Sequence, residues 1–304
     1  MLLRRLLPSS FALALLTAAS ACKKAPEAGT DGPGGGAAAG ATQSGTVLRY
    51  KAGPAKLKQT VKASFAASGD GGGGEAKVDL TGLLDVSPSG ADKLKIAYTV
   101  LEVRQIDLTG SMKPEVKEGQ PAPDVKADVQ AAKGARIVDL RGDEDKAATK
   151  GLAENAKSEK DKGGGAGGMV GAFLGLPPEM PKDGLAEGTP LKEHKEETTT
   201  IFGGIEIDME IDTTYTLVKV DSSSGKRLAE VKIESEASGA KELAQGGQSM
   251  MLALDVTSEA VVVFNLDDQL PVSVKQQSTQ AISAGPQGSF EIRFNSESSY
   301  EPAA

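Results

Sequence analysis

The only histidine of this 304-residue chain, His194, is the first candidate for catalytic or metal chemistry. It lies in the charged stretch LKEHKEE, at the expected start of a strand, without a cysteine or second histidine that could share a zinc ion. No GxSxG segment nearby would supply a nucleophile for a triad. The sequence therefore predicts no catalytic residue, no metal ligand set and no cofactor, and we expect a protein that is not an enzyme.

A row of carboxylates is the second arrangement that could do chemistry. Glu206, Asp208, Glu210 and Asp212 alternate with apolar residues, so they lie about 6.6 Å apart on one face of an expected strand. A calcium site needs oxygens that converge from a loop, whereas a straight strand spreads them. We expect a solvated face matched by lysine or threonine on the next strand, with a basic partner as the functional alternative.

Cys22 is the only cysteine, so no disulfide can form within the chain. Arg4 and Arg5 precede an apolar stretch, and small residues at 18–21 lead directly to Cys22. This order of charged, apolar and small residues is typical of a secretory signal peptide, here expected over residues 1–21. The apolar stretch is shorter than the ~20 residues that a membrane-spanning helix needs.

The four residues Ala19-Ser20-Ala21-Cys22 resemble the lipobox of bacterial lipoproteins. The resemblance implies cleavage before Cys22 and attachment of acyl chains such as palmitate, which would anchor the protein to a membrane of the cell envelope. Lys23 stands where an aspartate would retain a lipoprotein in the inner membrane, so the resemblance favours the outer membrane. The alternative is a secreted protein whose cysteine carries no lipid.

A tether and a folded body follow the anchor. Residues 22–45 are rich in glycine, alanine and small polar residues, which predicts a disordered linker. The body begins near Thr46 and has few aromatic residues, 4% of the chain, and no tryptophan. The formal net charge of −8 argues against nucleic acid as a partner, because nucleic-acid binding needs a basic surface.

Alternating apolar and polar residues predict that the body is mainly β. The clearest run is Ile205, Ile207, Met209 and Ile211, and a period of two is the pattern of a half-buried strand. Similar runs recur along the chain and are separated by turn sequences such as SPSGAD, DSSSGK and SAGPQG. Such short connections favour antiparallel hairpins over parallel crossovers.

Two stretches of the body resemble each other at a single offset of 134 residues, which predicts an internal duplication. Leu57 aligns with Leu191, Val86 with Val220 and Leu94 with Leu228. We therefore expect a first β unit over 46–142 and a second over 189–301. The alternative is that amphipathic hairpins are alike without common origin.

Residues 143–188 differ from both units. The stretch 143–162 is charged and alanine-rich, and it is expected to be a surface helix or a linker. Met169, Val170, Phe173 and Leu174 have the spacing of one helical face, so a short helix is predicted near 168–176. That helix would pack on a sheet, either as a plug at one end of the core or as a lid over an apolar cavity.

In its layout the body resembles uncharacterised bacterial lipoproteins that have a duplicated β-rich domain of unknown function. The resemblance covers roughly 46–301, carries no site residue, and implies a noncatalytic envelope protein. Two hypotheses follow: a structural or interaction module with a protein partner, or a carrier whose curved sheet holds a lipid or other apolar ligand. An apolar cavity of ~300 Å³ or more would favour the carrier.

Replacement of the lipobox cysteine tests the anchor. Cys22→Ser removes the thiol that would carry the lipid, so we expect a soluble or uncleaved protein that no longer partitions with membranes as the mature form does. Fractionation of cells that express either protein checks this. Processing and membrane binding equal to those of the parent would contradict the lipoprotein interpretation.

Overall fold

A computed structural model describes most of the body and none of the targeting region. The signal peptide, Cys22 and nearly all of the tether lie outside the described residues, as does most of 156–177. The structure describes residues 45–70, 72–114, 116, 122–155, 170, 173–175, 178–201, 205–245, 248–285 and 288–303.

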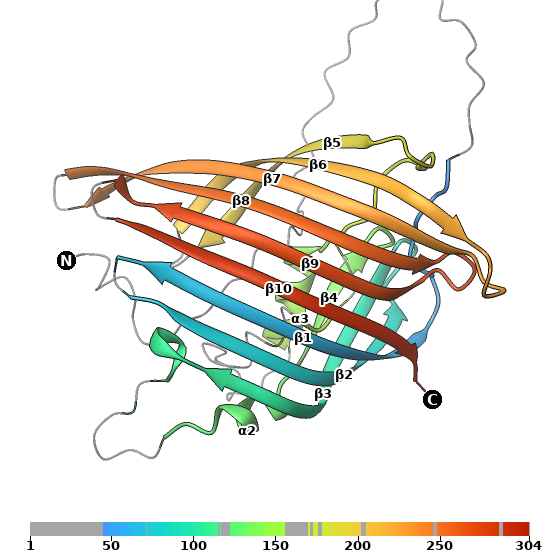
Figure 1. The fold of residues 1–304 in the computed structure, drawn as a ribbon, viewed down its shortest axis with the longest axis horizontal. Coiled ribbons are helices and arrows are strands. Elements are labelled where there is room, and N and C mark those ends of the chain that lie inside the picture. Colours follow the sequence, from blue (N-terminus) through green and yellow to red (C-terminus); the bar gives the residue numbers. More distant parts are fainter. Residues whose placement is uncertain are drawn as a thin grey trace, which may run out of the picture.

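Ten strands form one continuous antiparallel sheet, so the predicted mainly β fold is confirmed (Figure 1). The spatial order is β4-β3-β2-β1-β10-β9-β8-β7-β6-β5, and every pair of neighbours is antiparallel. The strands are β1 (Ala55–Gly69), β2 (Gly74–Pro88), β3 (Lys93–Leu108), β4 (Lys133–Asp139), β5 (Leu191–Ile201), β6 (Ile205–Asp221), β7 (Leu228–Gln245), β8 (Gln248–Asn265), β9 (Leu270–Ser283) and β10 (Ser289–Pro302).

The first and last strands of the chain are neighbours in the sheet. β1 pairs with β10 from Leu57↔Pro302 to Gly69↔Phe290, and this pairing joins a run of four strands to a run of six. The other neighbours follow one another in the sequence and are connected mostly by short turns. One such turn, between β6 and β7, requires Gly225, whose φ of +78° is disfavoured for other residues.

The duplication is not confirmed. β1-β2-β3 and β5-β6-β7 have the same order and direction, as a duplication would require. The registers differ, however: Leu57 pairs with Leu84, whereas Leu191 pairs with Tyr215 rather than with Val218 at the 134-residue offset. Both expected units lie within the one sheet.

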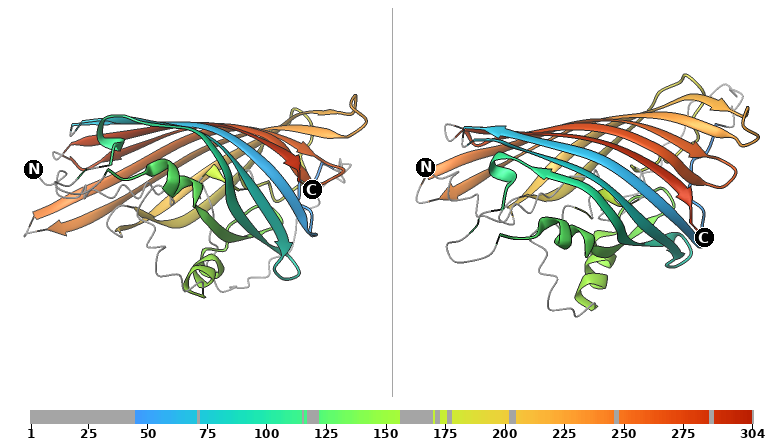
Figure 2. Two further views of the ribbon diagram at one scale, coloured as in Figure 1. Left: turned by 90° about the horizontal axis from the view of Figure 1, so that it is seen from below. Right: turned by 60° about the horizontal axis from the view of Figure 1, so that its bottom comes forward.

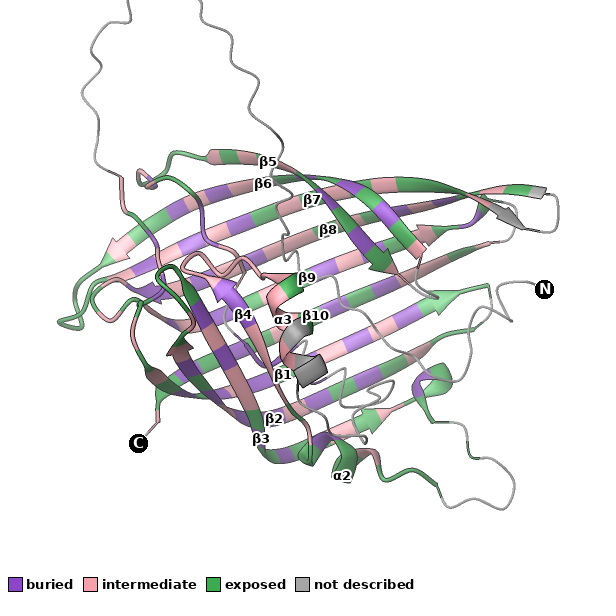
Figure 3. Cartoon of the chain, turned by 180° about the vertical axis from the view of Figure 1, so that it is seen from behind, coloured by how far each residue is buried: buried purple, intermediate pink, exposed green. Residues whose placement is uncertain are grey.

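Only one face of the sheet is extensively buried, and we call it the inner face. On β6, Ile207, Met209 and Ile211 are buried, whereas the alternate carboxylates from Glu206 to Asp212 are exposed. The expected orientation of this strand is therefore confirmed. Purple buried bands alternate with exposed ones along the strands in Figure 3.

The inner face is concave, and chain outside the strands lies over it. Figure 2 shows α2 (Val125–Gln130) and α3 (Lys146–Asn155) on the hollow side of the arched sheet. We call the described residues of 140–155 and 170–185, between β4 and β5, the cover segment. A 3-10 turn, η1 (Gly110–Met112), follows β3 before it.

Of the charged stretch 143–162, residues 146–155 form α3, which agrees with the surface-helix alternative, whereas 143–145 are not helical and Glu144 forms a β-bridge with Val138. The helix predicted near 168–176 is only partly described. Val170 and Phe173 have helical backbone, and the Leu174 N–H donates to the Val170 carbonyl over 3.0 Å. The remainder of that prediction falls outside the described residues.

The two edges of the sheet are protected in different ways. The β4 edge bonds to the chain that follows it, because the Asp145 N–H donates to the Ile137 carbonyl and the Ile137 N–H donates to the Thr149 hydroxyl. β5 carries charged side chains on both faces, a feature that discourages edge-to-edge association. No helix of the described part of the chain has the length and apolar character to cross a membrane.

The two faces of β6 should respond differently to substitution. Ile207→Ala removes buried contacts and leaves a cavity, so it should lower the free energy of unfolding by ~2–5 kcal/mol. Asp208→Asn changes an exposed side chain and should alter it by no more than ~0.5 kcal/mol. Denaturant unfolding of both variants checks this, and a larger loss for Asp208→Asn would mean that the acidic row is not a solvated face.

Candidate functional site

The residues singled out for chemistry on β5 and β6 lie on the outer face. His194 Nδ1 is 2.9 Å from Asp212 Oδ1, and this hydrogen bond raises the pKa of the exposed imidazole. The Thr198 hydroxyl donates to Asp208 over 2.6 Å. The acidic row is therefore matched by polar residues of the neighbouring strand, as expected. The described residues bring no group of three or more histidine, cysteine or acidic side chains together in a metal-binding arrangement.

The inner face instead shows a polar clamp where β1 meets β10. Gln59 is almost fully buried, and its side-chain nitrogen donates to the Phe173 carbonyl over 3.0 Å. The Gly175 N–H donates back to Gln59 Oε1 over 2.9 Å. A buried polar group is costly unless it is hydrogen-bonded, so this exchange of bonds holds the cover segment to β1.

Tyr300 on β10 completes the clamp. It is the register partner of Gln59, and its hydroxyl donates to the Gly175 carbonyl over 2.9 Å. Burial raises the pKa of the Tyr300 phenol, so the hydroxyl remains protonated and able to donate at neutral pH. The first and last strands thus bind the same short stretch of the cover segment.

An aromatic cluster lies farther along the same pair of strands. Phe65 on β1 and Phe294 on β10 are register partners, with ring centroids 5.0 Å apart. The ring of Phe173 lies 5.2 Å from Phe65 and 5.9 Å from Phe294. Burial of these three rings supplies the apolar part of the docking contact.

The side chain of Leu174 packs directly on Gly82 of β2, a position that must be glycine. A Cβ atom at Gly82 of β2 would lie 2.6 Å from a methyl carbon of Leu174, so a larger residue would clash with this fully buried side chain. Arg136 of β4 donates to the Leu174 carbonyl over 2.8 Å. These contacts place Leu174 on the inner face, while Phe173 lines the cavity described below, so the plug and the lid both stay predictions.

An ion-pair network joins the cover segment to β5. Arg141 lies 2.6 Å from a carboxylate oxygen of Glu179 and 3.1 Å from one of Glu193, and its side chain is only 13% exposed. Lys195 lies 3.1 Å from Glu179 and 3.8 Å from Asp143.

A separate buried ion pair joins Glu197 of β5 to the cover segment. Its Oε1 contacts Lys146 of α3, and its side chain is only 3% exposed. This role was not predicted, because LKEHKEE has the composition of a charged, solvated strand entry. The alternation was the available signal: Glu193, Lys195 and Glu197 share a face with Thr199, which is buried.

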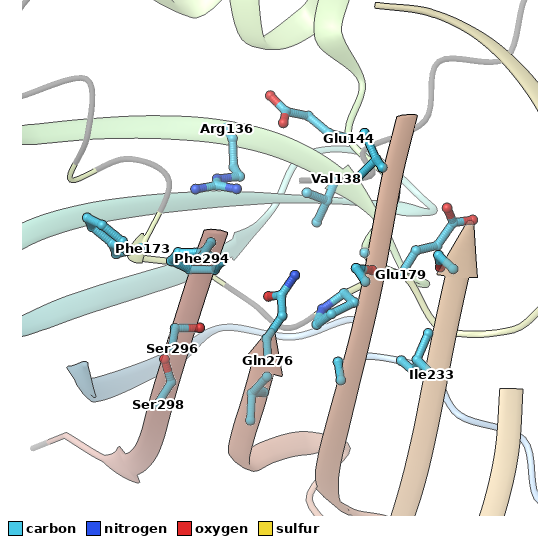
Figure 4. Close-up of a pocket in the computed structure, with 18 of the residues that line it drawn as sticks. Arg136, Val138, Glu144, Phe173, Glu179, Ile233, Gln276, Phe294, Ser296 and Ser298 are labelled. Atoms are coloured by element: carbon cyan, nitrogen blue, oxygen red, sulfur yellow. The ribbon is translucent and has the colours of Figure 1, made fainter. Parts of the chain in front are cut away.

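A partly enclosed cavity of about 130 Å³ lies between the cover segment and the inner face, and its surface is mainly apolar. Figure 4 shows Arg136 and Val138 of β4 on one side of the cavity. They face Gln276 of β9 and Phe294 of β10. The lining residues include Gln59, Ile96, Arg136, Val138, Glu144, Phe173, Glu179, Glu197, Thr199, Met209, Ile233, Ser258, Ala260, Val274, Gln276, Phe294, Ser296, Ser298 and Tyr300.

The size of the cavity limits what it can hold. It is smaller than the ~300 Å³ at the lower end of ligand pockets, the volume that would have favoured a lipid carrier. An apolar cavity of ~150 Å³ in another protein holds benzene, so a ring of that size would fill this slightly smaller cavity and any further atoms would extend through its open side. The cavity therefore suits a small apolar group rather than a whole acyl chain.

Comparison with models of protein families, with curated proteins and with solved structures finds no match to this chain. The site is therefore interpreted from its own geometry.

Replacing the buried glutamine tests the clamp. Gln59→Leu keeps the volume but leaves the Gly175 N–H and the Phe173 carbonyl without this partner, and each unsatisfied group costs ~1–3 kcal/mol. We expect a less stable protein in denaturant unfolding and faster proteolysis near residues 170–180. Gln277→Leu, on the exposed face of β9, is the matched control. Equal stability of the two variants would contradict the clamp.

Proposed function

We propose that this chain is a noncatalytic envelope lipoprotein, anchored through Cys22, whose body binds a small apolar group on the inner face of the sheet. The observation that carries the binding role is the mainly apolar cavity beneath the cover segment. The lipobox resemblance supports the anchor and a place at the outer membrane, and the tether would hold the body away from the lipid surface.

The cavity is lined by apolar side chains and by a few polar ones, as binding sites usually are. Ile233, Ala260 and Val274 supply an apolar wall, while Ser258, Gln276 and Ser296 supply groups that can orient a ligand. This assignment keeps the carrier hypothesis, but only a ring or a short alkyl group of the ligand would enter the cavity. A longer molecule would have to place the rest of its length outside the cavity.

An interaction module is the second candidate function. The exposed carboxylates of Glu206, Asp208, Glu210 and Asp212 favour it, because they form an acidic row on the outer face. A basic protein partner would be the matching ligand. The two roles use opposite faces of the sheet and are compatible with one another.

Filling the cavity tests the binding role. Ala260 is buried on β8 and lines the cavity, so Ala260→Leu should occupy part of the space and weaken binding of benzyl alcohol by at least about tenfold. Calorimetric titration of the full chain in lipid nanodiscs, corrected for empty nanodiscs, measures this.

Ala253→Leu is the matched control, because Ala253 lies on the same strand but faces the other side of the sheet. It should leave the affinity unchanged. Absence of benzyl alcohol binding to the parent, or equal affinities of Ala260→Leu and the parent, would contradict the proposed function.

A further inference from the structure

The sheet side of the cavity carries an amide group that a ligand can reach. Gln276 of β9 is half-buried and lines the cavity, and Figure 4 shows its side chain pointing away from the strand into that space. Among the described residues, no group forms a hydrogen bond with this amide. Neither its oxygen nor its nitrogen is closed off by packed protein, so a donor and an acceptor are available in the cavity.

Two serine hydroxyls lie near this amide on the same side of the cavity. Ser296 of β10 is the register partner of Gln276, and Ser258 lies on β8, the strand on the other side. Their hydroxyls also form no hydrogen bond with another described residue. We call Ser258, Gln276 and Ser296 the polar patch. All three side chains are uncharged, so the polar patch suits a neutral group that both donates and accepts.

A carboxamide is the group that best complements a glutamine side chain. It carries an acceptor and two donors in one plane, so two amides can exchange a pair of hydrogen bonds. Gln59 already forms this pattern with the backbone of the cover segment, because it accepts from the Gly175 N–H and donates to the Phe173 carbonyl. Gln276 presents the same two groups to the cavity, where no described residue takes them.

We propose that the cavity binds a neutral carboxamide with a small apolar group, and that the carboxamide exchanges two hydrogen bonds with Gln276. This inference rests on the proposed function and specifies its ligand class. The apolar group packs against side chains such as Ala260 and Val274, which flank the polar patch in the lining. A carboxylate in the same place is disfavoured, because Glu144 and Glu179 also line the cavity and would repel it.

The test uses four molecules of nearly the same shape, each with as many non-hydrogen atoms as benzene: isobutyramide, methyl isopropyl ketone, isobutyrate and isobutyramidine. They present a carboxamide, a neutral acceptor, an anion and a cation. Calorimetric titration of the full chain in lipid nanodiscs, corrected for empty nanodiscs, should give at least about tenfold tighter binding of the amide than of the ketone. The ketone leaves the Gln276 oxygen without a donor, and a site built to form such a bond rejects the analogue that lacks it.

Replacing the amide of Gln276 should abolish the preference. Gln276→Met keeps the length of the side chain without its donor and acceptor, so isobutyramide and the ketone should bind to it with equal affinity. The free energy of unfolding should not fall, because no described residue forms a hydrogen bond with that amide. Gln277→Met, on the exposed outer face of β9, is the matched control and should keep the preference of the parent. A preference retained by Gln276→Met would overturn the role of Gln276.

The failures of the two proposals differ. Equal affinities of the parent for isobutyramide and the ketone, as expected if water satisfies Gln276 equally well, would overturn the carboxamide assignment. Tighter binding of isobutyrate or isobutyramidine than of isobutyramide would also overturn it, in favour of a charged ligand. Benzyl alcohol binding in the same experiment would leave the cavity as a binding site, whereas binding of none of the five molecules would overturn both proposals.

Discussion

The pairing of β1 with β10 is the constraint on which the remaining structure depends. It joins strands that begin more than 230 residues apart in the sequence and turns two runs of strands into one sheet. Because the chain between β4 and β5 leaves one edge of that sheet and must reach the other, it has to cross a face. Its described residues lie over the apolar inner face, and the cavity lies beneath them.

The same seam also provides the docking contacts for the cover segment. Gln59 and Tyr300 bind its backbone, while Phe65 and Phe294 receive the ring of Phe173. Docking of the cover segment therefore requires the seam to be formed. At the β5 edge the contacts are ionic instead, with Arg141 and Lys195 between the carboxylates.

Much of the sheet could be predicted from the sequence, because the alternation of apolar and polar residues predicts each strand and its buried face. The inward orientation of Ile207 and the exposure of Asp208 follow from that period alone. The β1–β10 pairing could not be predicted in this way, since alternation says which face a residue occupies but not which distant strand lies beside it. The 134-residue offset also did not predict strand pairing, because residues aligned by it have different partners in the sheet.

The candidate site was harder to predict than the strands. Gln59 lies between Leu57 and Val61 on the buried face of β1, and its place in that alternation is the only local signal of its burial. Glu197 is hidden in a strand with charges on both faces, where sequence alone does not distinguish a solvated carboxylate from a buried one. In both cases the deciding partner belongs to the cover segment, whose position depends on tertiary contacts rather than on local propensity.

Amide hydrogen exchange of Gly175 in the full chain tests most directly whether the seam holds the cover segment. Its N–H donates to the buried side chain of Gln59, so the account predicts protection close to that of the β1 and β10 amides. Exchange of the Gly175 amide at the rate of an unprotected peptide, with β1 and β10 still protected, would show that the cover segment is not docked and would contradict the account.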